Sequence, residues 1–127
     1  MALSEIKQYF MRNTTPSLDE YIEICHGKTA GLFKTVLYSC AKFIESDTEA
    51  AEKFGELFGI AFQIKNDFED YSSNEDKKNN IHNSVDILGI EKAHALLDNY
   101  KRELTELLQK LPDNIYRKNL EDIVGKL

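Results

Sequence analysis

The stretch FGELFGIAFQIKNDFED, residues 54–70, decides the fold class of this chain. Its apolar side chains cover most of the circumference of a helix, which is typical of a helix buried on several sides. Gly55 and Gly59 lie four residues apart, a spacing that lets another helix backbone approach closely. The stretch therefore predicts a buried helix from about Thr48 to Tyr71, with apolar positions at Phe54, Leu57, Phe58, Ala61, Phe62, Ile64 and Phe68.

Helical patterns also precede this stretch. We expect a short helix over residues 2–11, a turn over 13–17 and a longer helix over about 18–44. Ser17 and Glu20 have the spacing of a capping box, in which each side chain accepts a hydrogen bond from the backbone of the other residue. This pair therefore predicts where the longer helix begins.

The remaining chain continues the helical pattern. A polar loop is expected over residues 72–83, followed by a helix over about 90–111 and a short last helix that ends at Leu127. Pro16 and Pro112 are the only prolines, and both lie in predicted turns. No segment shows the sustained alternation of a strand, so the predicted fold class is all-α. With 127 residues, the chain is long enough for about one domain.

Composition argues against several classes of protein. Acidic residues outnumber basic ones 22 to 16, giving a net charge of -6 without a basic stripe, so no nucleic-acid partner is expected. No apolar run approaches the ~20 residues of a transmembrane segment. Cys25 and Cys40, without a secretory hydrophobic region, predict two reduced and mostly buried thiols. We expect a cytoplasmic protein.

One polar face interrupts the predicted central helix. Gln63, Asn66, Asp67 and Asp70 lie at i, i+3, i+4 and i+7, which places them on one side of the helix. Two carboxylates three residues apart can hold Mg²⁺ through oxygen when substrate phosphates fill its other positions. The alternative is a solvated helix end, and the spacing alone does not decide between the two.

A lysine in the second helix is another candidate. Residues 26–29, His-Gly-Lys-Thr, end like a P-loop, but Ile22 stands where the earlier glycine belongs and the flanks are helical. We therefore exclude a P-loop. Lys28 can still pair with a phosphate as a point charge, and an ordinary solvated lysine is the alternative.

Three ordered segments resemble the trans-isoprenyl diphosphate synthase (polyprenyl synthetase) family over about residues 18–111. Tyr21 and residues 28–33 resemble its Y-x-x-x-x-x-x-K-T-x-x-L-F segment. Residues 62–70, FQIKNDFED, are similar to its second aspartate-rich motif, F-Q-x-x-D-D-x-x-D. Residues 88–93 resemble its L-G-x-x-x-A segment. The resemblance implies the C-terminal half of the all-α isoprenoid synthase fold.

The resemblance also implies a reaction and roles for particular residues. Members of the family condense an allylic diphosphate with isopentenyl diphosphate, with Mg²⁺ as cofactor. By position, Lys28 would hold the allylic diphosphate, Thr29 would lie beside it, and Gln63 would face the reacting centre. Asp67 and Asp70 would help to bind Mg²⁺, directly or through water. Lys28 and Asp67 are thus the expected catalytic residues.

Three departures from the family pattern bear on activity. Asn66 replaces the first aspartate of the second motif, so this expected metal position offers a neutral amide oxygen, a weaker ligand than a carboxylate. Nothing before residue 18 resembles the family's first aspartate-rich motif, so residues 1–127 correspond to a single partial domain. The family's lysine-bearing loop is shortened here, and Lys77 or Lys78 is the candidate replacement.

Two functional hypotheses follow. The first is that the chain is part of a prenyltransferase, is inactive alone and needs a missing N-terminal half. The second is a non-catalytic regulatory or partner subunit of such a synthase. Both predict a homo- or hetero-oligomer, because a half-fold leaves apolar helix surface exposed.

Overall fold

The computed structural model describes residues 1–43, 45–73 and 82–127. All regular structure within these ranges is helical, which confirms the all-α class. A predicted helix over 18–44 is present as two α-helices joined by a π-helical turn. In chain order, the elements are α1 (Ala2–Met11), α2 (Leu18–Cys25), η1 (His26–Ala30), α3 (Gly31–Phe43), α4 (Thr48–Ser73), α6 (Ser84–Leu88), α7 (Ile90–Gln109) and α8 (Ile115–Gly125).

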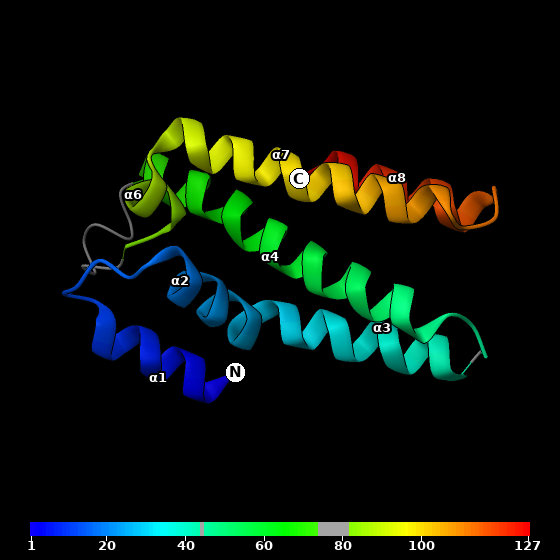
Figure 1. Ribbon diagram of the computed structural model, residues 1–127, viewed down its shortest axis with the longest axis horizontal. Coiled ribbons are helices and arrows are strands. Elements are labelled where there is room, and N and C mark those ends of the chain that lie inside the picture. The colour runs from blue at the N-terminus through cyan, green and yellow to red at the C-terminus, as the bar shows by residue number, and fades with distance from the viewer. Residues whose placement is uncertain (44, 74–81) are drawn as a thin grey trace.

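Helix α4 runs through the middle of the molecule (Figure 1). It packs against η1 and α3 on one side and against α7 on the other, while α1 lies outside α2 and η1. This confirms the central helix expected from its apolar circumference. Its buried side chains join those of the neighbouring helices in one core: Tyr21, Cys25, Ala30, Phe54, Phe58, Ile60, Ala61, Ile64, Leu97, Leu104, Leu108 and Val124.

The two glycines of α4 are required by close backbone approach. A Cβ atom on Gly59 would lie 2.4 Å from Cα of Ala30, and one on Gly55 would lie 2.7 Å from the backbone nitrogen of Lys34. Both distances are too short for a side chain, so α4 touches η1 and α3 almost backbone to backbone. This contact brings the polar face of α4 next to the turn that carries Lys28.

The π-helical turn η1 contains Lys28 and Thr29, so the local backbone is helical and the exclusion of a P-loop is confirmed. The Gly31 N–H bonds the carbonyl of His26, five residues back, which widens the helix at this point. The capping box at the start of α2 is also confirmed. The Glu20 N–H donates to Ser17 Oγ at 3.2 Å, and the Ser17 N–H donates to Glu20 Oε2 at 2.8 Å.

Helix α6 was absent from the predicted elements. It begins at an Asn83 cap, whose Oδ1 accepts hydrogen bonds from the Val85 and Asp86 backbone at 3.0 and 3.1 Å. It ends at Leu88 and is followed by Gly89, which has a φ of +81°. Five residues are too few to show a helical period, so only the cap signals were available. The predicted loop over 72–83 lies mostly outside the described residues, as do Lys77 and Lys78.

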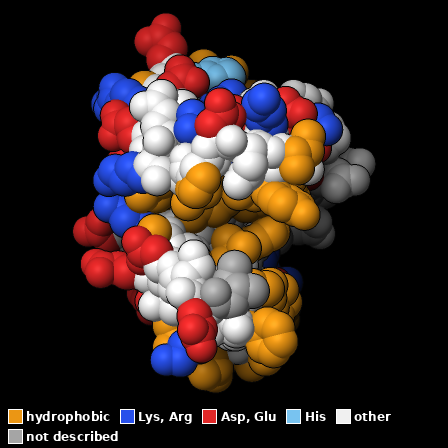
Figure 2. All heavy atoms as spheres, turned by 90° about the vertical axis from the view of Figure 1, so that its right-hand side faces the viewer, with side chains coloured by type: hydrophobic (Ala, Val, Ile, Leu, Met, Phe, Trp, Pro, Cys, Tyr) orange, Lys and Arg blue, Asp and Glu red, His pale blue; other side chains and the backbone are white. Residues whose placement is uncertain are grey.

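An apolar hollow of about 220 Å³ lies between α3 and α4 on one side and α7 and α8 on the other. Figure 2 shows hydrophobic side chains gathered across this end of the molecule. Cys40 lies at its edge and is exposed, whereas Cys25 is buried, and both thiols are free. The expectation of two buried cysteines is therefore wrong for Cys40, because that face of α3 is uncovered. None of the described helices is long and apolar enough to cross a membrane.

Candidate functional site

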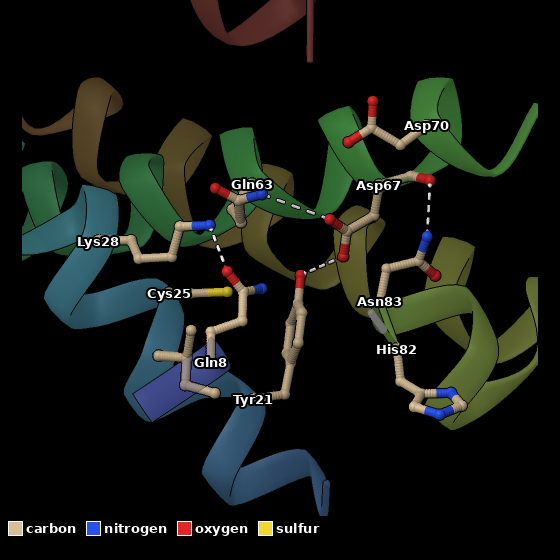
Figure 3. Close-up of a pocket in the computed structure, with 10 residues that line it drawn as sticks. Gln8, Tyr21, Cys25, Lys28, Gln63, Asp67, Asp70, His82 and Asn83 are labelled. Carbon is tan, nitrogen blue, oxygen red and sulfur yellow. Dashed lines mark hydrogen bonds between the residues drawn. The ribbon is translucent and has the colours of Figure 1, made fainter. Parts of the chain in front are cut away.

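A polar cavity of about 80 Å³ lies where α1, α2, η1 and α4 meet the segment before α6 (Figure 3). Of the predicted site residues, Lys28, Gln63, Asp67 and Asp70 line it, and Thr29 and Asn66 do not. The structure thus brings together residues from two helices that lie more than thirty positions apart in sequence. The complete lining is Gln8, Tyr21, Ile24, Cys25, Lys28, Gln63, Asp67, Asp70, His82 and Asn83.

Asp67 is buried, with 3% of its surface exposed, and its carboxylate accepts hydrogen bonds from three parts of the fold. Oδ2 accepts from the Tyr21 hydroxyl at 2.5 Å and from the Ser84 N–H at 2.8 Å. Oδ1 accepts from Gln63 Nε2 at 3.4 Å. Burial raises the pKa of the Asp67 carboxyl, and the hydrogen bonds from Tyr21 and Ser84 oppose that rise. Asp67 therefore ties α2 and the start of α6 to α4.

The raised pKa of Asp67 predicts a dependence of stability on pH. Between the unfolded pKa of about 3.9 and the raised folded pKa, the folded protein binds more protons than the unfolded chain. The contribution of this group to the free energy of unfolding therefore falls as pH rises through that window. Asp67→Asn keeps an oxygen acceptor but does not titrate, so the variant should lack this fall. Urea unfolding of the wild type and of Asp67→Asn at several pH values measures the free energy of unfolding. The same dependence on pH in both proteins would contradict the raised pKa of Asp67.

Lys28 projects from η1 into the cavity, with 22% of its side chain exposed. Its Nζ donates a hydrogen bond to Gln8 Oε1 at 2.8 Å and lies 3.4 Å from Glu5 Oε1. Both partners belong to α1. Lys28 is therefore not an ordinary solvated surface lysine, since its ammonium group is mostly covered and is paired with Gln8 and Glu5.

Thr29 acts on the cavity through Gln63. The Thr29 hydroxyl donates to Gln63 Oε1 at 3.2 Å, while Gln63 Nε2 donates to Asp67 Oδ1. The amide is thus held at both ends, and its orientation follows from that network. Thr29 does not line the cavity itself. It fixes the direction of the glutamine side chain that does.

The described residues show no preformed Mg²⁺ site. Mg²⁺ requires oxygen ligands at about 2.0–2.1 Å in an octahedral arrangement. Both short hydrogen bonds to Asp67 converge on Oδ2, Oδ1 receives a third, and the carboxylate is almost fully covered. Asn66 lies off the cavity lining. Within the described part of the chain, no three His, Cys, Asp or Glu side chains are grouped to hold a metal. Metal roles for Asp67, Asp70 and Asn66 stay predictions.

Sequence reasoning missed the contributions of Gln8, Glu5 and Tyr21. One signal was available for Tyr21, because it lies seven residues before Lys28 and shares its helix face. No local signal pointed to Gln8 or Glu5, since the turn after α1 decides which face of that helix meets Lys28. Cys25 also lines the cavity, and burial raises the pKa of its thiol to about 12, so it is not a nucleophile at neutral pH.

Comparison with known proteins identifies the family of the chain. The model of the polyprenyl synthetase family matches residues 1–123. The chain belongs to the polyprenyl synthetase family. This match extends beyond the resemblance over residues 18–111 in both directions, and it includes α1 and most of α8. The lysine, glutamine and aspartates of the cavity therefore lie within a polyprenyl synthetase fold.

Individual relatives agree with the family. A geranylgeranyl pyrophosphate synthase of Aspergillus flavus is 33% identical over 69 residues, which are 52% of this chain and 19% of that protein. A geranyltransferase of Helicobacter pylori, solved in complex with magnesium and isoprenyl diphosphate, has a TM-score of 0.80 at 20% identity. A decaprenyl diphosphate synthase of Rhodobacter capsulatus has a TM-score of 0.73 at 23% identity.

The polyprenyl synthetase fold is represented here over part of its length. The structural match covers 99% of this chain and 46% of the Helicobacter pylori protein. For the Rhodobacter capsulatus protein the shares are 98% and 54%. The chain therefore spans about half the length of the solved structures that it matches.

Proposed function

We propose that this chain supplies the C-terminal half of a trans-isoprenyl diphosphate synthase, which condenses an allylic diphosphate with isopentenyl diphosphate. The observation that carries the proposal is the position of Lys28, whose ammonium group reaches a polar cavity shared with Gln63 and Asp70. An ammonium group in a largely covered site is suited to bind a diphosphate and to stabilise its charge.

The roles of the residues follow from the bonds that change. In the proposed reaction the allylic C–O bond breaks, and the diphosphate leaves with the bonding electrons. The double bond of isopentenyl diphosphate attacks the resulting cation, and a proton is then lost. Lys28 stabilises the departing diphosphate. Gln63, held by Thr29 and Asp67, offers a fixed amide dipole beside it. Magnesium at this site stays a prediction, and no step assigned to these residues depends on it.

The size of the cavity supports a need for a complementary segment. Its volume is about 80 Å³. Sites that enclose small-molecule ligands usually measure roughly 300–1,000 Å³. Large apolar side chains are also uncovered: Leu3 is 82% exposed, Phe10 78% and Phe43 89%. A helical segment equivalent to the rest of the synthase fold would cover such side chains and complete the substrate walls. The assembled protein is proposed to be an oligomer in the cytoplasm.

The proposal predicts that the chain alone shows no detectable prenyl transfer and that a complementary N-terminal half of a synthase restores it. Labelled isopentenyl diphosphate, an allylic diphosphate and Mg²⁺ are incubated with each half and with the mixture, and prenyl products are extracted and counted. Turnover by the purified chain alone would contradict the need for a second half. A mixture that forms a complex but remains inactive would contradict the catalytic role.

A non-catalytic partner subunit is the second candidate, and Asn66, which stands where the family motif has an aspartate, favours it. Such a subunit would alter the activity of a complete synthase without lending residues to its chemistry. The two functions differ in their response to Lys28→Ala. In a split enzyme, loss of Lys28 lowers turnover. In a regulatory subunit, the effect on the complete synthase persists without Lys28.

A further inference from the structure

We infer that Glu5 competes with an anionic ligand for Lys28, so that helix α1 sets the affinity of the cavity for diphosphate. The identity of the ligand rests on the proposed function. The competition itself rests on the contacts of α1. Glu5 Oε1 lies 3.4 Å from Lys28 Nζ, and the Gln8 side chain of the same helix accepts a hydrogen bond from that ammonium at 2.8 Å.

Helix α1 makes polar contacts with this lysine and with α2. It contributes no buried residue to the protein. Besides the two contacts with Lys28, it forms an ion pair between Lys7 and Glu23 at 2.5 Å. Its outward apolar side chains do not hold it in place. The Lys28 contacts therefore belong to the polar contacts that hold α1 against η1 and α2.

Helix α1 nevertheless packs closely against η1. A Cβ atom on Gly27 would lie 1.7 Å from Ser4 Oγ, so α1 rests against the turn that carries Lys28 at the one position without a side chain. Glu5 follows Ser4 directly in the sequence. This contact places the Glu5 carboxylate beside the ammonium.

A diphosphate that binds Lys28 must take over part of this pairing. A phosphate oxygen bonds an ammonium at about 2.8 Å, which brings its negative charge close to the carboxylate of Glu5. The two anions repel one another and compete for the same cation. The Lys28 side chain is 22% exposed and that of Glu5 60%, so water and salt screen this competition in part. Removing the charge of Glu5 should therefore strengthen diphosphate binding.

The test is calorimetric titration of the full chain with inorganic diphosphate at low and high salt. Glu5→Gln is expected to bind about three- to tenfold more tightly than the wild type at low salt, with a smaller difference at high salt. Glu69→Gln is the matched control. It removes the same charge from an exposed position on α4, where Glu69 pairs with Lys65, and should bind like the wild type.

A third variant separates the inference from the proposed function. Equal affinities of the wild type and Glu5→Gln, with loss of binding in Lys28→Ala, would overturn the competition and leave the diphosphate site intact. Binding that persists in Lys28→Ala would overturn the proposed site itself. Failure of Glu5→Gln to bind diphosphate would overturn the inference, because Lys28 would then not be a free anion site even without its competitor. Circular dichroism confirms that each variant is folded.

Discussion

Asp67→Ala is expected to lower the free energy of unfolding by about 2–5 kcal/mol, since each buried donor that loses its acceptor costs about 1–3 kcal/mol. The Tyr21 hydroxyl and the Ser84 N–H both donate to the Asp67 carboxylate, and Ser84 is fully buried. Alanine offers neither donor an acceptor. Urea unfolding followed by circular dichroism, at a pH where the wild type is folded, measures the loss.

Two companion variants show whether the loss comes from these hydrogen bonds. Glu69→Ala removes an exposed carboxylate two residues further along α4 and should change stability by no more than about 0.5 kcal/mol. Tyr21→Phe should lower the free energy of unfolding by less in the Asp67→Ala background than in the wild type, because the carboxylate that accepts the Tyr21 hydrogen bond is already absent. An Asp67→Ala protein as stable as Glu69→Ala would show that Asp67 does not anchor the fold.

Lys28→Ala is expected to weaken diphosphate binding by about 10- to 100-fold, the equivalent of the roughly 1.5–3 kcal/mol of a hydrogen bond to a charged group. In the complete enzyme, the same variant should lower kcat/KM for the allylic diphosphate by a similar factor. The reason is that Lys28 is the one lysine or arginine among the described residues that line the polar cavity. Calorimetric titration and steady-state kinetics provide the two measurements.

Lys34→Ala is the matched control for this variant. Lys34 lies six residues further along, and its side chain is 32% exposed. It pairs with Glu52 at 3.0 Å and Glu56 at 3.9 Å, away from the cavity. Its loss changes net charge by the same amount, so it should leave diphosphate binding within about twofold of the wild type. Equal losses in both variants would indicate a general charge effect and remove Lys28 from the site.

Most of the fold could be predicted from local patterns. The apolar circumference of residues 54–70 identified α4, and the Ser17–Glu20 capping box identified the start of α2. The predicted ends of the long helices lie within about two residues of the observed ones. The π-helical turn at residues 26–30 and the short helix α6 were not predicted. A single widened turn or a five-residue helix contains too few residues for a period to appear.

The candidate site was predicted less completely. Spacing placed four residues of α4 on one face, and all of them except Asn66 line the cavity: Gln63, Asn66, Asp67 and Asp70. The same spacing did not show whether Asp67 binds a metal or holds neighbouring helices through hydrogen bonds. Asp67 is covered by Tyr21 and Ser84, which lie 46 positions before it and 17 positions after it. Contacts between residues so far apart in sequence cannot be predicted from the helical periodicity of one segment.

The sequence by itself determined that α4 is a buried helix with one polar face and that Lys28 belongs to a helix, because helical periodicity and capping act within a few residues. Only the tertiary structure decided that Gly59 brings α4 against η1, that Asp67 is enclosed by hydrogen-bond donors, and that Glu5 faces Lys28. The physical reason is that burial and charge pairing depend on which helix faces meet. The turns and the packing of the whole chain determine which helix faces come into contact.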